Sequence, residues 1–164
     1  MKQRTPIRWD AGKSVVENVR EVLPPMAREL FAQGRRAASG KVKSKKLHEL
    51  RLQAKRFRYT LELFQPLFGP AMTDRIGRLR RLQQRLGAIS DCVATRNLLK
   101  DLSGKKTAKA KEVFAWLERR EQEKIRQFLT YWHQTFDLPG EEERWVSYLR
   151  RYAGRRRRPG PPPG

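Results

Sequence analysis

Apolar side chains recur at every third or fourth position through most of this sequence, and this spacing limits the fold more than any other feature. It places them on one face of an α-helix, whereas a half-buried strand would need them at every second position. No segment alternates apolar and polar residues cleanly enough to indicate a strand. The sequence therefore predicts an all-α fold, an antiparallel helical bundle of long helices with short loops.

Capping residues and helix breakers divide the pattern into separate helices. The first is expected to begin near Lys13 or Ser14, with a kink or a short break at Pro24-Pro25. The later helices are expected at residues 44–64, 73–102, 107–136 and 141–152, with 107–136 the longest. Within 73–102, Gly87 is expected either to end the helix or to bend it.

The length and composition indicate one folded domain. A chain of 164 residues falls within the usual scale of about 100–200 residues per domain, and a hydrophobic share of 38% can supply a core. We expect residues 1–12 to be an N-terminal extension and 13–153 the helical bundle. Residues 154–164 are expected to be a disordered tail, because they are rich in Arg, Pro and Gly and hold no large apolar side chain to bury.

The net charge predicts a polyanionic partner. The chain has 38 Lys and Arg against 17 Asp and Glu, a formal net charge of +21. Such a charge suits nucleic acid, an anionic membrane surface or inorganic polyphosphate. A membrane span is not expected, since no apolar run is long enough, and the N-terminus lacks the pattern of a signal peptide. We therefore expect a cytoplasmic protein.

Neither metal chemistry nor catalysis is expected. One cysteine excludes a multi-Cys zinc site, and His48 and His133 lie far apart in the sequence. No phosphate-binding glycine loop, His-Glu-x-x-His or Gly-x-Ser-x-Gly motif occurs. Carboxylates that could hold Mg²⁺ against a phosphoanhydride are not clustered. The sequence predicts no catalytic residues, no metal site and no cofactor, and hence no enzyme.

A row of basic side chains runs along the helix expected at 44–64. Four of them share one face beside the apolar face: His48, Arg51, Lys55 and Arg58. Like charges at this spacing destabilise an isolated helix by about 0.2–0.5 kcal/mol per pair. Glu49 and Glu62 are too few to neutralise the row, so we expect an external anion to stabilise it.

A second basic row lies on the following helix. It consists of Arg78, Arg81 and Arg85. Because a short loop makes the two helices neighbours, we expect the rows to face each other across one groove, where Arg and Lys would bind phosphate oxygens. We also expect substitution of Arg51 and Arg58 by Glu to abolish binding without harming the fold. A solvated face that binds nothing would give similar rows, but their doubling and the scarcity of acids favour a binding groove.

These helices resemble a known family. His48-x-x-Arg51-x-x-x-Lys55-Arg56-x-Arg58 is similar to the signature helix of the CHAD domains, the histidine α-helical domain family, and the block from Leu79 to Gly87 is similar to its next helix. The resemblance covers roughly residues 44–102. It implies a helical domain that binds inorganic polyphosphate in a basic pore or groove. The candidate polyphosphate-binding residues are His48, Arg51, Lys55, Arg56, Arg58, Arg78, Arg81 and Arg85.

Two alternatives stay open. Family members often contain two pseudo-symmetric bundles, whereas this chain shows one clear copy, so it either forms half of the usual pore or completes it as a homodimer. The other function that we consider is sequence-nonspecific binding of nucleic acid. The tryptophans and tyrosines fall on apolar rows and are expected to pack in the core rather than stack on bases. Polyphosphate binding would allow association with polyphosphate granules.

Overall fold

The computed structural model describes residues 8–102, 108–151, 153 and 154, and the regular structure in these ranges is helical throughout. The helices are α1 (Val15–Ala38), α2 (Ser44–Phe64), the short 3₁₀ helix η1 (Gln65–Leu67), α3 (Ala71–Leu102), α4 (Ala108–Thr135) and α5 (Glu141–Arg151). The predicted all-α bundle is confirmed. Among the described helices, none is both long and apolar enough to cross a membrane. The expected disordered tail lies almost entirely outside the described residues.

Helix α1 begins where its capping residues predict. The Ser14 hydroxyl accepts a hydrogen bond from the Glu17 backbone N–H, and the Glu17 carboxylate accepts one from the Ser14 N–H at 2.8 Å. This reciprocal pair satisfies two of the N–H groups that a helix start leaves without partners. The expected break at Pro24-Pro25 is wrong, because α1 is continuous through both prolines. Burial of the flanking Leu23 and Met26 outweighs the hydrogen bonds that the prolines remove.

Helix α3 runs without interruption past Gly87, so an end at that residue is excluded. Leu86 and Ile89 on either side are buried, and their core contacts hold the helix together despite the cost of a central glycine. α3 has 32 residues and α4 has 28, so the expectation that 107–136 forms the longest helix is wrong.

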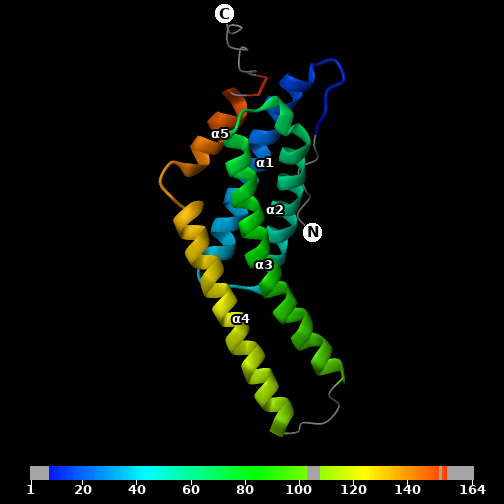
Figure 1. Cartoon of the computed structure of the whole chain (residues 1–164), viewed down its shortest axis with the longest axis vertical. Coiled ribbons are helices and arrows are strands. Elements are labelled where there is room, and N and C mark those ends of the chain that lie inside the picture. Colours follow the sequence, from blue (N-terminus) through cyan, green and yellow to red (C-terminus); the bar gives the residue numbers. More distant parts are fainter. Residues whose placement is uncertain (1–7, 103–107, 152, 155–164) are drawn as a thin grey trace, which may run out of the picture.

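The helices pack in chain order, each against the next, from α1 to α4, and α5 returns to lie along α1. In Figure 1 α4 and α5 share one side of the bundle, α5 in its upper half and α4 below it. The far ends of α3 and α4 extend beyond the other helices as a two-helix arm. Helix α3 packs against two neighbours, α2 and α4.

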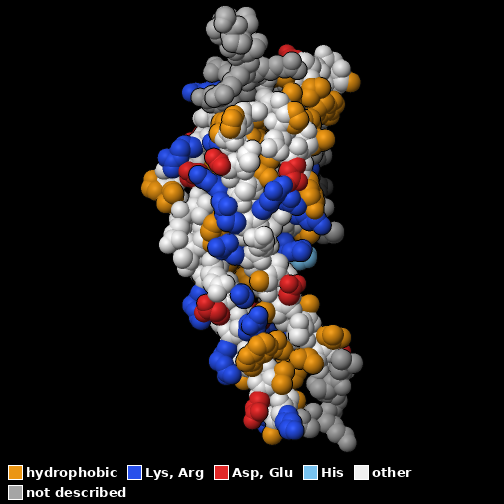
Figure 2. All heavy atoms as spheres, in the orientation of Figure 1, with side chains coloured by type: hydrophobic (Ala, Val, Ile, Leu, Met, Phe, Trp, Pro, Cys, Tyr) orange, Lys and Arg blue, Asp and Glu red, His pale blue; other side chains and the backbone are white. Residues whose placement is uncertain are grey.

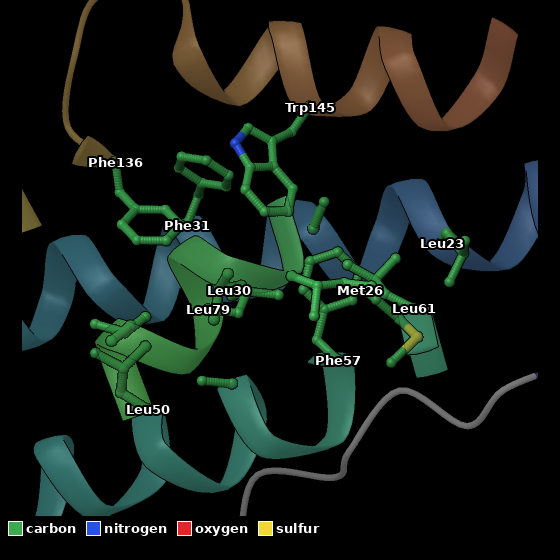
Figure 3. Packing of buried hydrophobic residues seen from close by; sticks show 14 of the residues in the cluster. Leu23, Met26, Leu30, Phe31, Leu50, Phe57, Leu61, Leu79, Phe136 and Trp145 are labelled. Atoms are coloured by element: carbon green, nitrogen blue, oxygen red, sulfur yellow. The ribbon is translucent and has the colours of Figure 1, made fainter. Parts of the chain in front are cut away.

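Aromatic side chains from several helices meet at the centre of the bundle (Figure 3). Phe31 of α1 lies about 6 Å, between ring centroids, from Trp132, Phe136 and Trp145. Phe57 of α2 lies 6.0 Å from Trp145. This packing fixes the rotation of α2, so that its apolar face is buried while His48 and Lys55 are exposed.

Gly34 lets α1 and α4 approach closely. A Cβ atom at this position would lie 1.8 Å from the Trp132 ring, which is fully buried and stacked on Phe136. At Gly87, apart from the adjoining residues and the backbone of the same helix, no heavy atom would lie within 4 Å of such a Cβ atom.

Replacing these two glycines by alanine should therefore have opposite effects on stability. Gly34→Ala forces the buried indole to move and should lower the free energy of unfolding by about 1–3 kcal/mol. Gly87→Ala should raise it by up to about 1 kcal/mol, because alanine is the better helix former. Urea denaturation of both variants measures the difference. An unchanged stability for Gly34→Ala would contradict the close α1–α4 contact.

Candidate functional site

In the basic row of α2 (His48, Arg51, Lys55 and Arg58), the first three side chains are fully or partly accessible to solvent. His48 and Lys55 are exposed and Arg51 is half-buried. In the described part of the chain, none of these side chains forms an ion pair with a carboxylate. Figure 2 shows Lys and Arg side chains gathered over α3 and the adjoining parts of α2 and α4, with few acidic ones between them.

The fourth member of the row, Arg58, is engaged inside the bundle. Its Nε donates to Gln83 Oε1 of α3 at 2.7 Å, and its guanidinium pairs with Glu62 at 2.7 Å. Glu62 also pairs with Arg80 of α3 at 2.8 Å. The Arg58 side chain is only 15% exposed, so it joins α2 to α3. The expectation that acids leave the row without compensation is therefore wrong at Arg58.

Arg78 likewise has a structural partner. Its guanidinium pairs with Glu141 at 2.7 Å, and Glu141 is buried at the start of α5. The same carboxylate accepts hydrogen bonds from Arg144 at 2.8 Å and from the Trp145 indole at 3.1 Å. Because a buried carboxylate is costly unless it is paired, these three donors stabilise its charge and join α3 to α5.

Arg81 and Arg85 lie toward α4 rather than α2. Arg81 Nε donates to the Tyr131 hydroxyl at 3.3 Å, and the Arg85 guanidinium lies 4.1 Å from the centre of the Tyr131 ring. The contacts that the structure shows for these two arginines are thus with α4, whereas the expected groove between them and the α2 row stays a prediction. Arg80 and Gln83 occupy the α2 flank of α3 instead, where they contact Glu62 and Arg58.

Two tyrosines accompany the basic rows, contrary to expectation. Tyr59 is 50% exposed, and Arg58 and Lys55 lie 4.3 and 5.8 Å from its ring centre. In the α3 row, the Arg85 guanidinium lies in the same way over the ring of Tyr131. Cations at such distances are attracted to the ring face. Tyr59 follows Lys55 by four residues, so the sequence spacing could have shown that its ring lies beside the α2 row. Tyr131 lies 50 residues after Arg81 in the sequence, so no local spacing shows its contact with the α3 row.

The candidate residues thus divide into two groups. Arg58 and Arg78 have glutamate partners within the bundle, and half-buried Arg56, which falls outside the α2 row by helical phase, is also engaged. The remaining five, which we call the open cations, form no ion pair with a described carboxylate: His48, Arg51, Lys55, Arg81 and Arg85. Within the described ranges, no group of three or more His, Cys, Asp or Glu could hold a metal ion. The surface offers positive charge and hydrogen-bond donors.

The role of Arg58 predicts a stability effect that Arg51 should not show. Arg58→Glu removes two charge-assisted contacts and places a carboxylate beside Glu62, which should lower the free energy of unfolding by about 2 kcal/mol. Arg51→Glu removes no described ion pair and should change it by less than about 0.5 kcal/mol. Chemical denaturation of the two variants compares them, and equal stabilities would contradict the assignment of Arg58 as a structural residue.

Comparison with known proteins shows the family to which the chain belongs. No match was found among curated proteins or among solved structures. The family model of the CHAD domain matches residues 4–100, more than half of the chain. The matched part contains α1, α2, most of α3 and every candidate residue named from the sequence, whereas Tyr131 lies beyond it. The chain therefore belongs to the CHAD domain family.

Proposed function

We propose that this protein binds inorganic polyphosphate through the open cations of α2 and α3 and does not transform it. The observation that carries this proposal is the division among the basic side chains. Arginines that hold the helices together have glutamate partners, whereas the open cations have no described carboxylate partner on a chain of net charge +21. An anionic chain would supply the missing negative charge.

Phosphate oxygens suit these side chains. An arginine presents two parallel N–H donors to a phosphate group, and such charge-assisted hydrogen bonds are roughly twice as strong as neutral ones. Lys55 and His48 add donors along the same helix. The open cations stand on helices of the bundle rather than on loops, so their backbone positions are fixed before the ligand arrives. Polyphosphate binding is also the known kind of role for the CHAD family.

The tyrosines favour polyphosphate over single-stranded nucleic acid. Proteins that bind single strands without sequence preference stack bases on open aromatic rings. Here Arg58 covers part of the Tyr59 ring and Arg85 lies over the Tyr131 ring. Binding of polyphosphate does not require an open aromatic ring, because the polymer has no bases and is bound through its phosphate oxygens.

Charge reversal on α2 tests this proposal. Arg51→Glu/Lys55→Glu should weaken binding of long-chain polyphosphate at least about 10-fold, since it replaces two donors by two repelling carboxylates. The matched control is Lys111→Glu/Arg119→Glu, which makes the same change in net charge at exposed positions of α4. Titration of labelled polyphosphate at physiological salt measures both.

The control should retain most of the affinity of the unsubstituted protein. If both double variants lost affinity equally, overall charge alone would explain the binding and the assigned surface would be wrong. No measurable binding by the unsubstituted protein would overturn the proposed function itself.

A further inference from the structure

We propose that the boundary between α3 and α4 is a second phosphate-binding subsite, to which α4 contributes Tyr131 and Lys124. We call this site the α3–α4 seam, and it consists of Arg81, Arg85, Lys124 and Tyr131. The inference rests on the proposed function and extends it to a helix that lies outside the family match, which ends at residue 100.

Tyr131 contacts three successive members of the α3 row. Its hydroxyl donates to the Arg78 carbonyl at 3.0 Å and accepts from Arg81 Nε at 3.3 Å, while its ring lies beneath the Arg85 guanidinium. A free arginine side chain has about 2 kcal/mol of conformational entropy to lose when it binds. Tyr131 restricts Arg81 and Arg85 before binding and so reduces this cost. It is a positioning residue for both arginines.

Lys124 extends the basic surface along α4. It precedes Tyr131 by seven residues, about two helical turns, and therefore lies on the same face of the helix, roughly 10 Å farther along the axis. Its ammonium donates to the neutral Gln127 side chain at 3.3 Å and forms no ion pair with a described carboxylate. The adjacent Glu123 attracts Lys124 electrostatically but is paired with Arg126 at 2.5 Å, so the Lys124 ammonium can still donate to an anion.

Ion pairs mark both ends of the seam. Arg78 pairs with Glu141 at one end and Arg96 pairs with Glu121 at the other, and both carboxylates are buried. Between these pairs, Arg81, Arg85 and Lys124 have no described carboxylate partner. The cations without a described carboxylate partner therefore lie in the middle of the seam, between the two ion pairs.

Charge reversal of Lys124 tests the extent of the site. In titrations of the full chain with long-chain polyphosphate, Lys124→Glu should weaken binding about 5-fold. Arg119→Glu is the matched control, because Arg119 is an exposed cation of α4 that lies away from Tyr131 by helical phase, and it should change binding less than about 2-fold. Equal losses in the two variants would overturn the subsite.

A double-mutant cycle tests the positioning role. Tyr131→Phe keeps the ring beneath Arg85 but removes the hydroxyl, and it should weaken binding about 3-fold in the unsubstituted chain and in an Arg51→Ala background. In an Arg81→Ala background it should have almost no effect, since the hydroxyl no longer has a guanidinium to hold. A merely structural tyrosine would give the same loss in all three backgrounds.

The outcomes separate this inference from the proposed function. If the α2 variant Arg51→Glu/Lys55→Glu abolishes binding while Lys124→Glu and Tyr131→Phe leave it unchanged, the proposed function stands and the seam is overturned. If the unsubstituted chain does not bind polyphosphate, both fail together.

Discussion

Two glutamates determine which arginines of the α2 and α3 rows are structural. Glu62 pairs with Arg58 of its own helix and with Arg80 of α3, and buried Glu141 pairs with Arg78 and Arg144. A buried charge such as that of Glu141 is tolerated only when it is paired and hydrogen-bonded. Glu62 is partly exposed and pairs with arginines from both α2 and α3. With 38 basic and 17 acidic residues, the chain cannot pair every cation in this way. Arg51, Lys55, Arg81 and Arg85, on α2 and α3, are among the cations left without a described carboxylate partner.

The aromatic core complements this division of charge. Packing of Phe31, Phe57 and Trp145 fixes how each helix is rotated about its axis, and the rotation decides which flank carries the open cations. Gly34 permits Trp132 to enter the same core and brings α4 against the bundle. Because α4 is held there, Tyr131 can reach Arg81 and Arg85. Binding geometry on the surface therefore depends on close packing beneath it.

Local features of the chain were readable from the sequence. Apolar spacing predicts the bounds of α2. It also predicts that α1 begins near Ser14, where Ser14 and Glu17 form the helix cap. Of the outcomes expected at the helix breakers, a break at Pro24-Pro25 and a helix end at Gly87 do not occur, because buried neighbours hold the helix against its local preference.

The sequence does not predict which side chains of different helices contact each other. A helical wheel places a side chain relative to its own apolar face, but it does not say which neighbouring helix lies on each flank. Arg78 meets Glu141, which lies 63 residues away, and Arg81 meets Tyr131, which lies 50 residues away. The wheel of α3 therefore cannot show that Arg81 and Arg85 contact Tyr131 of α4.

The central claim is that the surface recognises a chain of phosphates and not merely any polyanion. Competition between long-chain polyphosphate and duplex DNA at physiological salt, matched in total phosphate, tests it most directly. Our account predicts that polyphosphate displaces DNA from the protein at a concentration well below that at which DNA displaces polyphosphate. Equal displacement in both directions, or a preference for DNA, would contradict it.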